Sequence, residues 1–129
     1  MIRKCEHMLS TKDGKKAIYI DVENKNEILD YIRQDKRHLK KFKFITDIIL
    51  SGLKNTKVYD KEDINEKCKD VTAMKFFKGQ ENDRIYCKEI KTETGTLIIV
   101  TSILHERKKD FSAKEIAIIN KVGGYDYEI

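Results

Sequence analysis

Apolar residues change their spacing along the chain, and each spacing predicts a different kind of element. Over Lys15–Glu23 they alternate with other residues, which is typical of a short strand. Over Glu27–Leu53 they recur every three or four residues, which is the period of a helix. The polar stretch Gln34–Arg37 interrupts this period and can divide the region into two packed helices. Gly52 is suited to cap the C-terminal end of the second helix.

The next part of the chain has the pattern of an antiparallel meander. Three strands are predicted, at Val71–Lys78, Arg84–Ile90 and Thr96–Leu104, with polar turns between them. The third strand contains no charged residue, so we expect it to be buried. Lysine, arginine and histidine residues lie at the ends of all three strands, which gives the predicted meander a cationic rim.

A final helix is predicted over Phe111–Val122. Ser112 and Glu115 have the spacing of a capping box at its start, and Gly123–Gly124 ends it. The order is then strand, helices, three strands, helix. This order indicates an α+β fold, with a small antiparallel β-sheet, N-terminal helices and a C-terminal helix, the helices lying on one face. We expect residues 1–129 to form one domain.

Two stretches have weaker patterns. Met1–Lys16 is polar with a turn signal at Asp13–Gly14, and Lys54–Asp70 is a polar connector that can hold a short helix near Lys61–Lys67. The chain contains no proline, so its turns depend on glycine, asparagine and aspartate.

Composition narrows the functional classes only in part. Hydrophobic residues make up 40% of the 129 positions, which is too many for a disordered chain. The 27 Lys and Arg residues outnumber the 22 Asp and Glu residues, giving a net charge of +5. A positive balance of this size favours a polyanionic partner, although many ordinary cytoplasmic proteins share it.

The cysteines and the apolar runs indicate the compartment. Cys5, Cys68 and Cys87 have no C-x-x-C spacing, and their odd number without a secretory leader predicts a reducing cytoplasm. We expect each to be an ordinary thiol. The apolar runs are too short to span a bilayer, so no membrane partner is expected.

Basic residues are concentrated on the predicted N-terminal helices. Between positions 33 and 43 a single acid, Asp35, accompanies Arg33, Lys36, Arg37, Lys40, Lys41 and Lys43. A solvated helix face is the ordinary explanation of such a bias. The alternatives are contact with a nucleic-acid backbone or with an acidic partner. The RNA-binding candidates in this region are Arg33, Arg37, Lys40 and Lys41.

Several enzyme classes lack their signatures here. There is no G-x-x-x-x-G-K-S/T, no G-x-G-x-x-G, no H-E-x-x-H and no G-x-S-x-G. His7, His38 and His105 lack metal-ligand spacing, so we expect neither a metal nor a cofactor. RNA cleavage by its own 2′-hydroxyl needs neither of them. The protein must remove the 2′ proton, stabilise the pentacoordinate phosphate and protonate the leaving 5′ oxygen.

Residue types suited to these roles lie at the ends of the predicted meander strands. A lysine among other cations has a lowered pKa and can act as a base, and arginine binds phosphate through two parallel hydrogen bonds. Cross-strand pairing can bring such residues together. Taken singly, each also fits a structural role. The catalytic candidates are Lys75, Lys78, Arg84 and His105, and further RNA-binding candidates are Arg107, Lys108 and Lys109.

The same segments carry a resemblance to a known family. F-F-K-G at 76–79 precedes D-R-I-Y at 83–86, and an apolar strand then ends in L-H-E-R-K-K at 104–109. A helix follows that opens F-S-A-K-E-I at 111–116. This order resembles the RelE/ParE superfamily of toxins from type II toxin–antitoxin pairs, nearest its HigB-like, phage-derived branch. The second half of the chain carries the match, and the N-terminal part agrees in the type and order of its elements.

The resemblance implies a RelE-like fold and a ribosome-dependent mRNA endonuclease that uses the metal-free 2′-hydroxyl route. It implies a cognate antitoxin, typically with a helix-turn-helix, as the partner. By position, Lys75 and Lys78 match strand lysines that act near the scissile phosphate. Arg84 matches a phosphate clamp, and His105 with Arg107–Lys109 matches the loop after the buried strand.

The resemblance also extends to the C-terminus. Tyr125 or Tyr127 matches an aromatic residue that stacks on a base or assists proton transfer.

Two other functions remain open. The ParE branch of the superfamily poisons gyrase and cuts no RNA, so the fold alone does not fix the activity. A non-enzymatic, gyrase-directed binding module is therefore the first alternative. The second alternative is an unrelated small basic protein-binding domain, whose charges are solvated surface.

Overall fold

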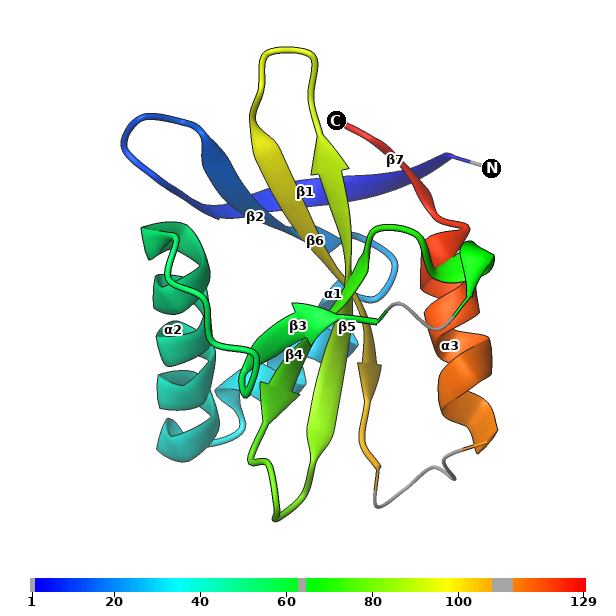
Figure 1. Ribbon diagram of the computed structural model, residues 1–129. Coiled ribbons are helices and arrows are strands. Elements are labelled where there is room, and N and C mark those ends of the chain that lie inside the picture. The colour runs from blue at the N-terminus through cyan, green and yellow to red at the C-terminus, as the bar shows by residue number, and fades with distance from the viewer. Residues whose placement is uncertain (1, 63–64, 108–112) are drawn as a thin grey trace.

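A mixed β-sheet crosses the molecule and separates two groups of helices (Figure 1). The computed structural model describes residues 2–62, 65–107 and 113–129. In the described residues the strands are β1 (Ile2–Ser10), β2 (Lys16–Asp21), β3 (Tyr59–Lys61), β4 (Val71–Phe76), β5 (Asp83–Lys91), β6 (Leu97–His105) and β7 (Asp126–Glu128). The helices are α1 (Lys25–Arg33), α2 (Lys36–Ser51) and α3 (Ala113–Gly123), with a 3₁₀ turn η1 (Glu66–Cys68).

The strand order is β3-β4-β5-β6-β2-β1-β7. β4, β5 and β6 form the predicted antiparallel meander, but β2 runs parallel to β6 and β7 runs parallel to β1. The α+β class is confirmed, but the sheet, predicted to be small and antiparallel, is mixed and has seven strands in the described residues. The helices after β2 carry the chain to the far edge of the sheet, and the meander then returns it so that β6 lies beside β2.

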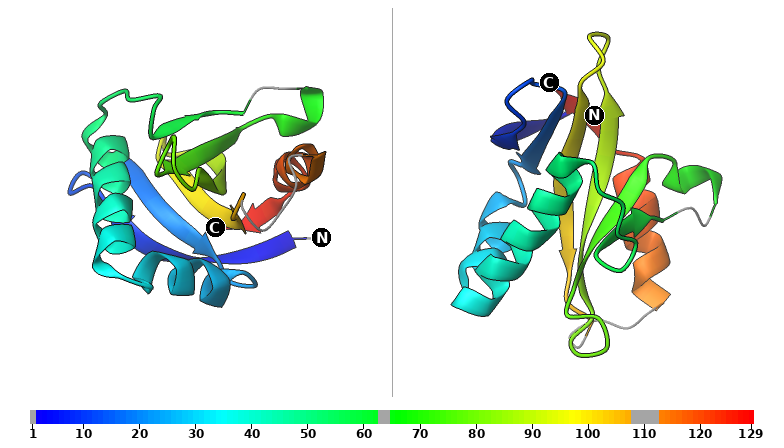
Figure 2. Two further views of the ribbon diagram at one scale, coloured as in Figure 1. Left: turned by 90° about the horizontal axis from the view of Figure 1, so that it is seen from below. Right: turned by 60° about the vertical axis from the view of Figure 1, so that its left-hand side comes forward.

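The helices cover both faces of the sheet, which also differs from the prediction. α1 and α2 pack on one face over Ile18, Met74, Ile85 and Ile99. α3 packs on the other face, over a second cluster that includes Tyr86. Figure 2 shows α1 and α2 together on one side of the strands and α3 on the other. β6 is covered by helices on both faces, which explains why its sequence contains no charged residue before its last position. The prediction that this strand is buried is confirmed.

A β-bulge in β6 decides which side chains reach the α3 face. Tyr86 pairs with Ile103 while the next residue, Cys87, pairs with Thr101, so Ser102 is the extra residue. Residues alternate between the two faces of a strand, and one extra residue reverses the phase beyond it. Ile99 therefore faces α2, whereas Ile103 faces α3. Without the bulge, the end of β6 would point to the opposite face.

The helical region divides where the sequence predicts. Asp35 is the N-cap of α2, and its Oδ1 accepts a 2.8 Å hydrogen bond from the backbone N–H of His38. Gly52 ends α2 with a left-handed φ of 77°. The predicted capping residue Ser112 lies outside the described residues. No described helix is long and apolar enough to cross a membrane.

β1 and β7 were not predicted, and a buried polar network holds them to the sheet. The side chain of Asp21 at the end of β2 is fully buried and accepts two hydrogen bonds from Arg3, of 2.8 and 3.1 Å. The Tyr127 hydroxyl lies 2.7 Å from Asp21 Oδ2 and 2.8 Å from Ser102 Oγ. Asp21 therefore joins the first strand, the last strand and the bulge of β6.

Replacing Asp21 by asparagine should lower the free energy of unfolding at pH 7 by about 3 kcal/mol, because Arg3 loses its buried anionic partner. Burial alone would raise the pKa of Asp21, but hydrogen bonds from Arg3 and Tyr127 hold it below its ordinary value of 3.8. This stabilisation is thus fully present above pH 3.8 and is lost as the pH falls through the lower folded-state pKa. Chemical denaturation at pH 7 and in acid measures both effects.

The exposed Asp30→Asn is the matched control and should leave the free energy of unfolding nearly unchanged. An Asp21→Asn protein as stable as the parent at pH 7 would contradict this role of the network.

Candidate functional site

Three of the four predicted catalytic residues lie in one row across the sheet. Lys75 on β4 is the register partner of Arg84 on β5, which is in turn the partner of His105 on β6. Directly paired residues point to the same face, so this cross-strand row spans about 10 Å. Its neighbours two residues along β5 and β6, Tyr86 and Ile103, lie under α3, so the row faces α3 as well.

Glu115 connects the row to α3. Its Oε1 accepts hydrogen bonds from Arg107 Nε at 2.6 Å and from the Tyr86 hydroxyl at 3.1 Å, and it lies 3.4 Å from His105 Nδ1. Burial would raise the pKa of Glu115, but the hydrogen bond and charge of Arg107 hold it below its ordinary value. A carboxylate that is ionised at neutral pH therefore sits at the end of the row.

His105 and Tyr86 form the buried part of the site. The His105 side chain is fully buried, and its ring stacks on that of Tyr86 with 6.3 Å between centroids. Burial raises the pKa of the Tyr86 hydroxyl, which therefore stays protonated and can donate. An imidazole, a phenol and a carboxylate in contact are groups that can transfer protons.

Arg84 is held by a second carboxylate. Its Nη1 donates a 2.7 Å hydrogen bond to Glu62 Oε1, and the two side chains are 21% and 17% exposed. Arginine binds carboxylate and phosphate with the same hydrogen-bonding geometry. An anionic ligand that reaches Arg84 must therefore compete with Glu62.

The side chains of the lysine candidates and of Arg107 differ in how they relate to the row. Lys78 is exposed in the β4–β5 turn, outside the paired residues. The amine of Lys75 donates to the backbone oxygen of Thr56 at 3.1 Å, so it reaches over the edge of the sheet. Arg107 joins the site through Glu115, and the predicted Lys108 and Lys109 lie outside the described residues.

The C-terminal tyrosines, predicted to stack on a base, lie away from the row. They follow the end of α3, whereas Glu115 is in its first turn, and eleven residues of helix span about 16 Å. Tyr125 is buried, with the Arg3 guanidinium 4.0 Å from its ring centroid. The Tyr127 hydroxyl is bound in the Asp21 network. Both tyrosines thus stabilise the junction of the termini, Tyr125 through Arg3 and Tyr127 through Asp21.

The basic residues of α1 and α2 lie on the other side of the sheet from the row. A shallow groove there is lined by Lys36, Arg37, Lys40, Lys41, Phe44 and Phe77. The Arg37 guanidinium stacks over the Phe77 ring at 3.5 Å and bonds Glu81 in the β4–β5 turn. Arg33 is exposed at the end of α1, and the groove does not include it.

Phe77 has an unusual backbone conformation in this groove. Its φ of 55° is left-handed, which is rare for a bulky residue and indicates local strain. The T-shaped packing of its ring against His38, 4.9 Å away, helps to hold this conformation. We call this combination of cations and rings the α2 groove.

Sequence reasoning missed Glu62, Tyr86 and Glu115 as members of the site. Tyr86 is part of the D-R-I-Y segment, and Glu115 is part of the predicted capping box of α3. Each residue was therefore in a pattern that had been noted, but neither was assigned to the site. Nothing in the sequence marks Glu62, because its contact with Arg84 joins a connector to a strand.

Comparison with known proteins finds no match to this chain among family models, curated proteins or solved structures. Within the described part of the chain, no group of three or more His, Cys, Asp and Glu side chains could hold a metal ion.

Replacing Glu62 by glutamine should raise the affinity of the site for inorganic phosphate by about threefold to fivefold, because Arg84 no longer has a charged competitor. NMR titration of the arginine side-chain signals with phosphate measures this affinity. Glu66→Gln, at an exposed position nearby, is the matched control and should leave it unchanged. A weaker affinity for phosphate in Glu62→Gln than in the parent would contradict the competition.

Proposed function

We propose that the protein is a cytoplasmic toxin of the RelE/HigB type that cleaves mRNA at the ribosome without a metal and is neutralised by a cognate antitoxin. The single observation that supports this most is the cross-strand row. It gathers Lys75, Arg84 and His105 in the order that the resemblance implies, beside a carboxylate and a phenol.

The roles follow from charge and protonation. Arg84, once Glu62 is displaced, binds the scissile phosphate, and Lys75 adds a cation once its amine leaves the Thr56 carbonyl oxygen. Glu115 is the ionised group that can accept the 2′ proton, and His105 beside it can share that proton. The buried Tyr86 hydroxyl stays protonated and donates to Glu115, which keeps that carboxylate in place, and Glu115 can return the proton to the leaving 5′ oxygen. No step requires a redox group or a covalent intermediate with the protein.

The α2 groove supplies a second surface for RNA in this proposal. Lysine and arginine side chains bind phosphates, and exposed rings stack on unpaired bases. The β4–β5 turn carries Phe77 of the groove, and the row begins in the strands on either side of that turn. An RNA strand could therefore contact both surfaces around the end of the sheet.

Arg84→Ala should abolish growth inhibition and lower mRNA cleavage by about 100-fold or more, because the phosphate loses its clamp. Arg84→Lys should recover only part of the activity, since it keeps the charge and loses the paired hydrogen bonds. Induced expression followed by primer extension on mRNA measures cleavage, and thermal unfolding verifies the fold. Lys91→Ala, at the exposed end of β5, is the control and should remain toxic.

The same experiment separates the alternatives. Full toxicity of a folded Arg84→Ala protein would remove Arg84 from the site. Growth arrest with DNA damage and no discrete cuts would favour a gyrase-directed module, and no growth phenotype would favour a protein without toxin activity.

The double substitution Lys40→Ala and Lys41→Ala should weaken RNA binding about equally for all sequences and make it less dependent on salt, because fewer counterions are released. Affinities for an uncleavable 2′-deoxy-substituted RNA at several salt concentrations measure this effect. Lys12→Ala with Lys15→Ala, in the exposed β1–β2 turn, is the control of equal charge. Equal losses in both proteins would show that only net charge matters.

A further inference from the structure

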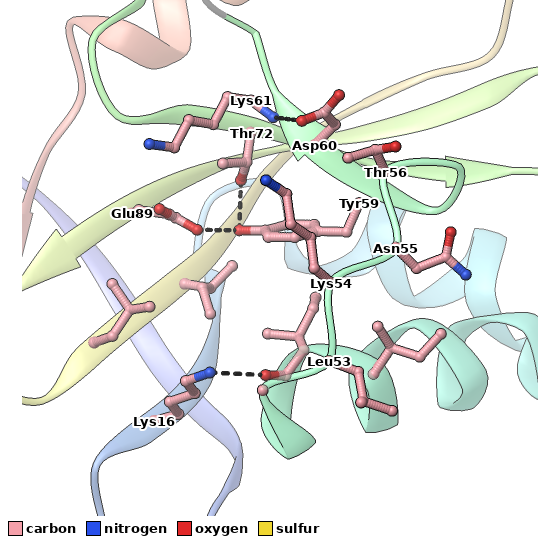
Figure 3. A pocket seen from close by; sticks show the side chains of 15 residues that line it. Lys16, Leu53, Lys54, Asn55, Thr56, Tyr59, Asp60, Lys61, Thr72 and Glu89 are labelled. Atoms are coloured by element: carbon pink, nitrogen blue, oxygen red, sulfur yellow. Dashed lines mark hydrogen bonds between the residues drawn. The ribbon is translucent and has the colours of Figure 1, made fainter.

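A cavity of about 340 Å³ opens beside the C-terminal end of α2, on the opposite face of the sheet from the cross-strand row (Figure 3). α2 ends at Gly52, and the segment that leads from there to β3 forms another wall of the cavity. Ile48 and Ile49 of α2 and Leu97 and Ile99 of β6 line the cavity. Its volume is within the range of small-molecule sites, which combine apolar walls with a few converging polar groups.

The polar groups form a short hydrogen-bonded chain in the wall of the cavity. Thr72 Oγ1 donates to the Tyr59 hydroxyl at 2.7 Å, and this hydroxyl donates to Glu89 Oε2 at 2.6 Å. Burial and the nearby Glu89 charge raise the pKa of Tyr59, so it remains a donor. Among the described residues, no donor binds the second oxygen of Glu89. Glu89 is therefore a carboxylate in the wall of the cavity, and one of its oxygens is bound by the Tyr59 hydroxyl.

Lysines line the outer part of the same cavity. Lys16 Nζ is bound to the carbonyl oxygen of Ile49 at 3.3 Å, which completes the end of α2. Lys54 and Lys61 are exposed, and neither forms an ion pair within the described part of the chain. In Figure 3 the side chains of Lys54, Tyr59 and Glu89 converge above the end of α2. A ligand here meets a carboxylate and an aromatic ring inside, and exposed positive charges outside.

We propose that this cavity binds a guanine nucleotide, either free or as a nucleotide of an RNA strand. The Watson–Crick edge of guanine carries two adjacent donors, the ring N–H and the amino group, which a carboxylate accepts. The flat base fits between the Tyr59 ring and the aliphatic side chains of α2, and the phosphate extends to Lys54 and Lys61. Adenine fits less well, since its edge places a ring acceptor next to its amino group, facing Glu89. This site does not depend on RNA cleavage.

Isothermal titration of the full chain with GMP, AMP and inorganic phosphate tests the proposal. GMP should bind saturably, and AMP and phosphate about tenfold or more weaker, because only GMP satisfies both Glu89 and the lysines. Glu89→Gln should lower the GMP affinity about tenfold, whereas Glu93→Gln in the exposed β5–β6 turn should not change it. The thermal unfolding temperature of each variant shows whether it is still folded, so that a loss of binding can be told from a loss of the fold.

Lys54→Ala provides a second variant at an exposed position, where the fold should tolerate the change. It should lower the GMP affinity a few-fold and reduce its dependence on salt. No saturable binding of GMP overturns the proposal, and so does binding that both Glu89→Gln and Lys54→Ala leave unchanged. A guanine-containing tetraribonucleotide identifies the source of the ligand. Tighter binding than GMP assigns the site to an RNA strand, and equal or weaker binding assigns it to free nucleotide.

Discussion

The structure depends on one strand that is buried from both sides. β6 pairs with β5 on one edge and with β2 on the other, α1 and α2 cover one of its faces, and α3 covers the other. Burial on both faces excludes charged side chains along its length, so ionisable groups can gather only at its ends. The bulge at Ser102 then selects the face to which the last residues point. Without the bulge, His105 would not be paired with Arg84.

The cluster at the end of β6 is electrostatically balanced in the absence of a ligand. Each of its two arginines is bound by a carboxylate, Arg84 by Glu62 and Arg107 by Glu115. These carboxylates reduce the cost of holding the arginines partly buried. They also occupy hydrogen-bonding positions that a phosphate could take. The pairing thus explains how a cationic site can be stable in the folded protein and still exchange one anion for another.

Local patterns predicted the parts of the fold that local forces determine. The helix period, the Asp35 interruption, the Gly52 cap and the meander all depend on neighbouring residues, and all are present. The strands β1 and β7 escaped prediction because contacts between the two ends of the chain hold them in place. β1 has no strict alternation of apolar and polar residues, and β7 is only three residues long.

The candidate site was predictable to a similar extent. Strand-end positions and the resemblance pointed to Lys75, Arg84 and His105, and the register brings them together. Glu62 and Glu115 could not be found this way, because carboxylates are common on surfaces and only tertiary packing sets these two against arginines. Tyr125 and Tyr127 were assigned by position alone, and β7 pairing places them in the core and the Asp21 network instead.

The chemistry of the RNA ends tests the central claim most directly. The purified protein would be added to translating ribosomes with an mRNA of defined sequence, and the ends at each cut would be identified. Attack by the 2′-hydroxyl predicts a 2′,3′-cyclic phosphate or 3′-phosphate upstream and a 5′-hydroxyl downstream, and no cut where a single 2′-deoxynucleotide precedes the scissile phosphate. Ends with a 3′-hydroxyl and a 5′-phosphate, or cleavage of the 2′-deoxy-substituted mRNA, would contradict it.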